Sequence, residues 1–180
     1  LYANLRDGAV AVNLRGYIIE CNKQFLQMLG GYTFDELSKM TFEDITPNRW
    51  LAKERKLIRH QVDRRGYSDL FEKEYIRKDG TKVPIEMQVY LLTDTNGKKS
   101  GYWAFVRDIS ERKKTEQALL QTRSYLANII NSMPSVIVGV DKTGVVTQWN
   151  SKAEEETGIS PENAIGKLIT DVYPQIRAEM

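Results

Sequence analysis

The sequence has few of the residues that metal centres, disulfides and membrane spans require. Cys21 is its one cysteine and His60 its one histidine, which excludes an intrachain disulfide and a four-thiolate or multi-histidine metal site within one chain. No apolar run approaches the roughly 20 residues that cross a bilayer. The formal net charge is +2, from 26 basic and 24 acidic residues, so we expect neither nucleic acid nor an anionic membrane as a partner.

The patterns that accompany catalysis are also missing. No glycine-rich segment is followed by Lys-Ser or Lys-Thr at the spacing of a phosphate-binding loop. No nucleophile–histidine arrangement can be argued when His60 is the single histidine. The carboxylate clusters, such as Asp35-Glu36, lie in short polar helical stretches and indicate solvated helix starts. We therefore expect that this chain is not an enzyme.

An internal repeat is the most informative feature that is present. Residues 8–22 read GAVAVNLRGYIIECN and residues 136–150 read VIVGVDKTGVVTQWN, and a helical segment follows each. An extra glycine at Gly30-Gly31 explains why the offset between the copies falls by one residue partway along. The matched pairs are Gly16 with Gly144 and Asn22 with Asn150 at an offset of 128, and Pro47 with Pro174 at an offset of 127.

The first copy predicts two short strands, several short helices, one longer helix and three longer strands. Asn22 is a suitable N-cap for the first helix, and the Lys78-Asp79-Gly80-Thr81 segment is a hairpin turn. This order predicts an α+β fold, a five-stranded antiparallel sheet with helices on one face. The predicted strands cover residues 8–13, 17–21, 70–77, 82–92 and 100–108, and the longest helix of this copy covers residues 48–65.

Apolar residues on the inner face of the sheet and on the facing helices predict a pocket between the two layers. Its lining is almost wholly apolar, which is typical of a plain core and also of a site for a small apolar or aromatic ligand. Both interpretations stay open, and no specific ligand is predicted. The expected walls are Val10, Val12, Phe25, Leu29, Leu37, Ile45, Trp50, Leu57, Met87, Val89 and Val106.

The last strand of the first copy is apolar on both faces. Trp103 and Phe105 share one face, while Ala104 and Val106 share the other. A sheet covered on one side only does not require this, so we expect a flanking helix or a second copy of the chain against the outer face. Tolerated exposed aromatics are the alternative. The residues of this expected dimer or flanking-helix face are Tyr90, Leu92, Trp103 and Phe105.

A helix is predicted from residue 110 to about residue 132, ahead of Pro134, with Asp108 and Glu111 as capping residues. Heptad spacing from Ile109 onward places charged residues at three seam positions, which favours a weak, adjustable parallel coiled coil. A single solvated spacer helix is the alternative. The residues expected to relay a signal along this segment are Asp108, Ile109, Glu111, Leu119, Leu126 and Ile130.

These motifs together resemble the PAS family of sensor domains. The strongest match is the Asp108-Ile109-Ser110-Glu111-Arg112-Lys113 segment, which is similar to the family's exit motif into a signalling helix. The asparagines at 22 and 150 and the Gly31-Tyr32-Thr33 segment also fit. The resemblance implies a complete PAS domain over residues 1–109, a linker helix over 110–133 and the first half of a second PAS domain over 134–180.

The resemblance further implies a sensory input module that detects a small molecule or mediates dimer contacts. We expect a cytoplasmic homodimer that signals to an output domain of the same polypeptide, often a histidine kinase of a two-component system. The first residue, Leu1, suggests a piece of a longer protein. No cofactor is expected. A haem sensor with His60 as axial ligand, or a flavin sensor with Cys21 as reactive thiol, is the alternative, although His60 lies in a charged turn and Cys21 lies on a strand.

The half-length second copy poses a physical problem. Residues 134–180 lack counterparts of the three later strands, which would bury Val136, Ile137, Val138, Val145 and Val146. Half a domain rarely buries enough apolar surface to offset the entropy of the chain. We expect a continuation of the chain, or another chain, to complete it.

Overall fold

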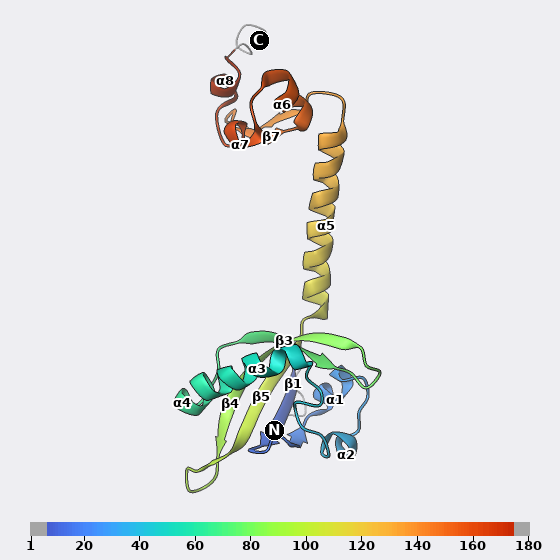
Figure 1. Ribbon diagram of the computed structural model, residues 1–180, viewed down its shortest axis with the longest axis vertical. Helices are drawn as coiled ribbons and strands as arrows, with labels where there is room; N and C mark the ends of the chain where they lie inside the picture. Colours follow the sequence, from blue (N-terminus) through green and yellow to red (C-terminus); the bar gives the residue numbers. More distant parts are fainter. Residues whose placement is uncertain (1–6, 175–180) are drawn as a thin grey trace. The chain divides into compact units, whose positions relative to one another are not determined.

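A computed structural model describes residues 7–174 of the protein (Figure 1). The chain divides into two compact units between Thr115 and Glu116, a point that lies inside helix α5 (Ser110–Ser132). We call residues 7–115 the first unit and residues 116–174 the second unit, and each is described by itself. Among the described residues, no helix combines the length and apolar character needed to cross a membrane.

The first unit contains an antiparallel sheet of five strands, as the sequence predicts. The strand order across the sheet is β2-β1-β5-β4-β3, so the first hairpin joins the later strands through pairing of β1 with β5. β1 pairs with β5 over six residues, from Gly8 opposite Val106 to Asn13 opposite Gly101. The strands are β1 (Gly8–Asn13), β2 (Ile18–Cys21), β3 (Phe71–Ile76), β4 (Lys82–Thr93) and β5 (Lys99–Asp108).

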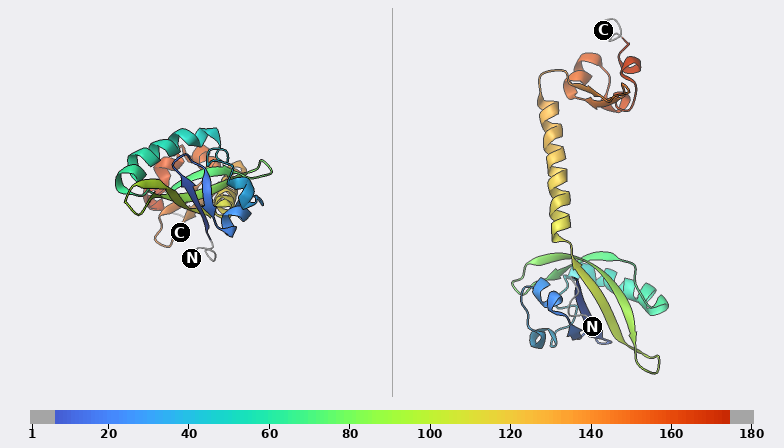
Figure 2. Two further views of the ribbon diagram at one scale, coloured as in Figure 1. Left: turned by 90° about the horizontal axis from the view of Figure 1, so that it is seen from below. Right: turned by 180° about the vertical axis from the view of Figure 1, so that it is seen from behind.

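Helical segments lie between β2 and β3 in the sequence. α3, η1 and α4 follow one another and lie over one face of the sheet (Figure 1 and Figure 2, left). The longest helix, predicted as regular from 48 to 65, contains a π-helical turn at η1, a wider turn that is frequent at functional sites. The elements are α1 (Lys23–Met28), α2 (Phe34–Leu37), α3 (Asn48–Leu57), η1 (Ile58–Val62) and α4 (Asp63–Arg65).

The main hydrophobic core of the first unit lies between the sheet and these helices. The inward positions of β4 alternate as predicted, because successive strand residues point to opposite faces. Phe25 and Leu29 bring the first helix into this core, and both are fully buried. The inward residues of β4 that are at most 3% exposed are Val83, Ile85, Met87 and Val89.

The second unit repeats the first hairpin and the short helices that follow it. β6 and β7 form a two-stranded antiparallel sheet, and Val146 and Trp149 of β7 lie in a small separate core with Ala153. The elements after α5 are β6 (Val138–Val140), β7 (Val146–Trp149), α6 (Ser151–Thr157), α7 (Pro161–Ala164) and α8 (Ile169–Val172).

The predicted repeat extends to individual hydrogen bonds of the two asparagines. The Asn22 side-chain oxygen accepts from the backbone N–H of Ala9 and of Phe25, both at 2.9 Å. The Asn150 side-chain oxygen accepts from the residues 128 positions further on, Ile137 at 2.9 Å and Ala153 at 3.0 Å. Each asparagine therefore caps a helix and fastens the preceding strand to it.

The one-residue change in offset is confirmed by a backbone bond further along the chain. Ile18 N–H donates to the Met40 carbonyl at 3.1 Å, and Val146 N–H donates to the Lys167 carbonyl at 2.8 Å. The donors are 128 residues apart and the acceptors 127 residues apart, so the deletion lies between them. Gly30 and Gly31 both have positive φ, a conformation that glycine adopts without a steric penalty.

Candidate functional site

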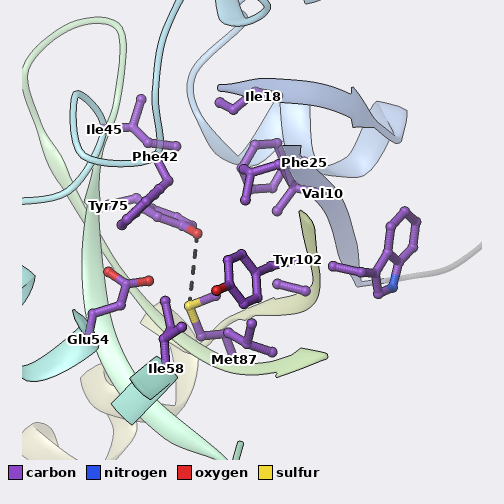
Figure 3. Close-up of a pocket in the computed structure, with 14 residues that line it drawn as sticks. Val10, Ile18, Phe25, Phe42, Ile45, Glu54, Ile58, Tyr75, Met87 and Tyr102 are labelled. Atoms are coloured by element: carbon purple, nitrogen blue, oxygen red, sulfur yellow. Dashed lines mark hydrogen bonds between the residues drawn. The ribbon is translucent and has the colours of Figure 1, made fainter. Parts of the chain in front are cut away.

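A small apolar cavity lies between the sheet and the helices of the first unit (Figure 3). Its volume is about 40 Å³. Strands β1 to β5 contribute walls, and α1, α3, η1 and the segment before α3 supply the rest. The lining residues are Val10, Val12, Ile18, Phe25, Phe42, Ile45, Glu54, Ile58, Tyr75, Met87, Val89, Tyr102, Trp103 and Ala104.

The structure brings together part of the predicted pocket. Of the expected walls, Val10, Val12, Phe25, Ile45, Met87 and Val89 line the cavity. Leu29, Leu37 and Val106 are fully buried in the core but do not line the cavity.

Trp50 and Leu57 differ from the prediction because of how the long helix is built. The Trp50 ring lies beside the Arg49 and Lys53 cations, 5.5 and 5.4 Å from its centre, and its indole N–H lies 3.5 Å from a Glu74 oxygen. With these charged neighbours at the surface, the Trp50 ring is half-exposed. Leu57 packs on the edge of the core, and the next residue, Ile58 in the π turn, lines the cavity instead.

A buried ion pair that the sequence did not predict lies beside the cavity. The Lys73 ammonium lies 2.7 Å from each carboxylate oxygen of Glu54 and 3.2 Å from the Thr46 hydroxyl. Lys73 is 2% exposed and Glu54 is 4% exposed. These contacts occupy the three donors of the ammonium, as burial of a charge requires. Burial lowers the pKa of Lys73, and the neighbouring Glu54 carboxylate opposes that shift.

Strand alternation explains why Lys73 points inward. Phe71, Lys73 and Tyr75 occupy alternate positions of β3, and the buried Tyr75 fixes that set as the inward one. The Lys73 ammonium also lies 4.4 Å from the centre of the Tyr75 ring, a favourable cation–π contact. The period-two alternation of β3 indicates that Lys73 points inward. Its charge, taken alone, is typical of a surface residue.

Two tyrosine hydroxyls differ in their partners although both residues line the cavity. The Tyr75 hydroxyl contacts the thioether sulfur of Met87 at 3.9 Å (Figure 3). The Tyr102 hydroxyl donates to the Asp63 carboxylate at 3.1 Å. Burial raises the pKa of Tyr75 well above its usual value, and burial followed by the Asp63 bond raises the pKa of Tyr102 to about 12. Both hydroxyls are therefore protonated donors at neutral pH.

The candidate haem ligand, His60, and the candidate flavin-reactive thiol, Cys21, lie outside the cavity. His60 is exposed on η1, and Cys21 is half-exposed on β2. Burial, followed by the charge of Glu20, raises the pKa of the Cys21 thiol to about 11, which disfavours the reactive thiolate. No group of three metal-ligating side chains gathers anywhere in residues 7–174. Neither a haem with His60 as ligand nor a flavin adduct at Cys21 fits this cavity.

The outer face of the sheet carries a cluster of aromatic side chains. Phe105 makes edge-to-face contacts with Trp103, at 5.8 Å between ring centres, and with Tyr90, at 6.1 Å. All three rings are half-buried, as is Leu92. Ala9 and Ala11 of β1 lie opposite Phe105 and Trp103 in the register and are at most 2% exposed.

The first turn of α5 is fastened to the edge of the sheet. Ile109 is 3% exposed, and its N–H donates to the Pro84 carbonyl at 3.1 Å. Arg112 forms ion pairs with Glu72 at 2.7 Å and Glu86 at 3.0 Å. Lys113 adds a second contact to Glu72 at 2.7 Å. The helix is thereby held by β3 and β4, strands that also line the cavity.

The predicted relay residues lie just before α5 and along it, in different surroundings. Ile109, the first seam position of the heptad spacing, is buried against the first unit. The Asp108 carboxylate accepts from Ser110 N–H at 2.7 Å, and Glu111 is exposed. Leu119 and Leu126 are each 52% exposed.

The far end of α5, which belongs to the second unit, is tied to the hairpin of that unit. Ile130 is half-buried, and its carbonyl accepts from the Asn150 side-chain nitrogen at 3.2 Å. The asparagine that fastens the hairpin of the second unit therefore also contacts the linker. The heptad pattern did not predict these contacts of α5. They join Arg112 and Lys113 to Glu72, and Ile130 to Asn150.

Comparison with known families matches both units. Residues 6–111 match the family described as PAS domain, and residues 124–180 match the family described as PAS fold.

Three curated relatives share parts of the chain. The probable diguanylate cyclase DgcE of Escherichia coli is 34% identical over 67% of this chain and 11% of its own length. The sensor histidine kinase TmoS of Ectopseudomonas mendocina is 23% identical over 95% of this chain and 19% of its own length. Sporulation kinase C of Bacillus subtilis is 25% identical over 69% of this chain and 28% of its own length. The chain thus spans less than a third of each relative.

Solved structures share the fold. The PAS domain of a Colwellia psychrerythraea protein superposes with a TM-score of 0.56 at 21% identity, covering 61% of this chain and 92% of that chain. A sensory box histidine kinase/response regulator from Burkholderia thailandensis superposes with a TM-score of 0.53 at 16% identity, covering 71% of this chain and 95% of that chain.

Proposed function

This chain belongs to the PAS domain family, the non-catalytic sensor modules of signalling proteins, and from that premise we propose that its first unit detects a small molecule. Occupancy of the cavity changes the contacts that β3 and β4 make with α5. α5 passes this change to the second unit and to an output domain. The observation that carries the proposal is that β3 and β4 line the cavity and also hold the first turn of α5.

The contacts on strand β3 give this relay a short path. The inward side chain of Lys73 holds Glu54, which lines the cavity. The adjacent residue, Glu72, points to the other side of the strand and holds Arg112 and Lys113 of α5. Because neighbouring strand residues move together, a shift of Lys73 displaces Glu72. Two discrete arrangements of these packed contacts would serve as the two signalling states.

Amide hydrogen exchange in the 180-residue protein tests this relay. A small molecule that binds in the cavity is expected to change the protection of amides in the first turn of α5, such as the Lys113 N–H that donates to Ile109. If a molecule binds in the cavity and the exchange of α5 stays the same, the relay is wrong. If nothing binds in the cavity, the sensing role is wrong.

A parallel dimer of the chain forms part of the proposal. Leu119 and Leu126 lie seven residues apart on α5 and expose apolar surface on the same side, which is the spacing of a coiled-coil seam. The aromatic cluster on the outer face of the sheet offers a second contact between copies. The two surfaces would let a change at α5 alter how the copies pack.

Sedimentation velocity of two matched double variants tests the dimer. L119D with L126D places charges in the seam and is expected to lower the self-association of the protein. Q121D with N128D adds the same charges, at the same spacing, to exposed positions of α5 two residues away, and is expected to leave association unchanged. Equal behaviour of the two variants would remove α5 from the dimer interface.

The output domain in this proposal is a histidine kinase. A relative that matches 95% of this chain is a sensor histidine kinase, and another is a sporulation kinase. The diguanylate cyclase among the relatives represents the other output class. Phosphorylation of a histidine in the full-length parent protein, measured with and without a cavity ligand, distinguishes the two classes.

A further inference from the structure

The charged group at the cavity wall is already neutralised. Glu54 lines the cavity, but both its oxygens accept from the Lys73 ammonium at 2.7 Å. The third donor of the Lys73 ammonium bonds to the Thr46 hydroxyl. An ionic ligand would enter an apolar space in which no opposite charge is left to offset its lost hydration. The cavity therefore favours a ligand without net charge.

The Tyr75 hydroxyl is the donor that a ligand can use. Tyr75 is 2% exposed and lines the cavity, and within the described part of the chain its hydroxyl bonds only to the Met87 sulfur, at 3.9 Å. A thioether is a weak acceptor, and a buried tyrosine hydroxyl normally finds a stronger one. In Figure 3 this hydroxyl lies at the centre of the lining residues. An oxygen atom of a ligand would replace the sulfur contact with a full hydrogen bond.

Tyr102 provides an internal contrast. Its ring also lines the cavity, but its hydroxyl already donates to Asp63 at 3.1 Å, and Asp63 is further held by Lys99 at 2.8 Å. Its single proton is therefore committed to a carboxylate, the stronger kind of acceptor. A ligand inside the cavity gains a donor from Tyr75 and none from Tyr102.

The size of the cavity limits the ligand. One water-sized group needs roughly 10–15 Å³ of such volume. A cavity of about 40 Å³ therefore accommodates about three or four non-hydrogen atoms without rearrangement. The remaining walls are aliphatic or aromatic, including Val10, Ile18 and Phe25.

We infer that the cavity binds a neutral molecule of about three or four non-hydrogen atoms that places one oxygen acceptor on the Tyr75 hydroxyl and an apolar body against Val10, Ile18 and Phe25. This inference rests on the proposed ligand-sensing function and adds the chemical class of the ligand. A small ketone, aldehyde or alcohol belongs to that class. Carboxylates and amines of the same size do not.

Four molecules of one shape separate these classes. Acetone, isobutene, acetate and acetamidinium are flat and have the same number of non-hydrogen atoms, but they are a neutral acceptor, a neutral hydrocarbon, an anion and a cation. Each is titrated into the 180-residue protein, and the amide NMR shifts of residues that line the cavity are followed. Dissociation constants for such small molecules lie in the millimolar range or above. Acetone is expected to bind most tightly, and neither ion is expected to bind.

Two conservative variants locate the acceptor. Y75F removes one hydroxyl while keeping the edge-to-face contact of the ring with Phe25, and is expected to weaken acetone binding roughly three- to tenfold. It is expected to leave isobutene binding unchanged. Y102F removes a hydroxyl that is committed to Asp63, and is expected to leave the binding of both molecules unchanged.

The outcomes separate the inference from the function on which it rests. Acetone binding that Y75F does not weaken, or binding of acetate or acetamidinium as tight as that of acetone, would overturn the ligand class while leaving a sensing cavity in place. Binding of none of the four molecules would mean a cavity that holds water only, and would overturn both the ligand class and the sensing role.

Discussion

Asn22 in the first unit and Asn150 in the second fasten a strand to a helix in the same way, yet the two hairpins end in different surroundings. In the first unit β5 pairs with the free edge of β1, and Val10 is 5% exposed. In the second unit, among the residues that the structure describes, β6 pairs with β7 alone, and the matching Val138 is 37% exposed. The hairpin and its asparagine cap are therefore a local structure, whereas burial of its apolar face needs the later strands.

The same comparison shows why the first unit holds the candidate site. The cavity needs side chains from β3, β4 and β5 in addition to the hairpin. The side chains at matching positions also differ in size between the two units. Phe25 and Ile45 line the cavity in the first unit, and Ala153 and Val172 stand at the matching positions of the second. A shared fold therefore does not imply a shared site.

The largest predicted effect comes from the buried ion pair of Lys73 with Glu54; the ion pairs described in the second unit lie at the surface. K73M leaves the buried Glu54 carboxylate without its partner and is expected to lower the free energy of unfolding of the first unit by about 3–5 kcal/mol. Urea unfolding followed by amide NMR measures each unit separately. E54L with K73M, which removes both charges, is expected to recover most of the loss. Unfolding of K73M at the urea concentration of the unchanged protein would contradict the burial of this pair.

Removing the matched asparagines tests whether the two hairpins are equivalent. N22A and N150A each leave buried backbone groups without their partner, at an expected cost of about 1–3 kcal/mol. N22D and N150D keep the accepting oxygen, lose the side-chain N–H donor, and are expected to cost less.

The two alanine substitutions should lower the free energy of unfolding by similar amounts, but with different consequences for the two units. The second unit has a smaller core, so we expect N150A to unfold the second unit while N22A leaves the first unit folded. N150A also frees the Ile130 carbonyl and is expected to raise amide exchange at the end of α5. If the second unit of N150A stays folded, its stability has another source.

A smaller effect is predicted where α5 meets the first unit. E72Q weakens the contacts of Arg112 and Lys113 and is expected to lower the protection of the first turn of α5 by about 0.2–1 kcal/mol, the usual range for exposed ion pairs. E74Q is the matched control, because Glu74 lies on the same strand face but pairs with Arg49 of α3. Equal changes in α5 exchange for the two variants would exclude a specific attachment through Glu72.

The smallest effect is a difference in acid sensitivity between the units. A hydrogen bond from Lys78, with a second from the Thr33 backbone, lowers the pKa of Glu36 from 4.5 to about 2. Because the folded pKa is the lower one, this interaction stabilises the first unit above about pH 4.5 and is lost as the pH falls toward 2. The matching residue of the second unit is Asn163, which does not titrate.

Thermal unfolding between pH 5 and pH 2, about the range over which the Glu36 contribution changes, measures this difference. E36Q removes the titrating group, and the midpoint temperature of its first unit is expected to fall less steeply with acid than that of the unchanged protein. Identical slopes would show that the Glu36 contacts do not contribute to stability in solution.

Periodicity and repetition predicted much of this fold. The alternation of Val83, Ile85 and Met87 gave the inward face of β4, and the offset of 128 between Asn22 and Asn150 predicted two equivalent caps. These features depend on neighbours in sequence or on a copy within the same chain, so the sequence contains the information directly.

The polar wall of the cavity depends on contacts between distant segments and was missed. Glu54 and Lys73 are 19 residues apart, and each alone resembles a surface residue. Their burial follows from the packing of α3 against β3, which propensity does not predict. Tyr75 is also recognisable only when the register of β3 is known. The attachment of α5 through Glu72 was missed for the same reason.

The central claim is that the first unit holds the ligand cavity and passes its state to α5. Titration of the 180-residue protein with acetone, followed by amide NMR shifts in both units, tests it most directly. We predict the largest shifts at the cavity strands β3 and β4 and in the first turn of α5, and smaller ones at Asn150, which contacts the far end of α5. Shifts confined to β7 and α6, or shifts at the cavity with none in α5, would contradict the account.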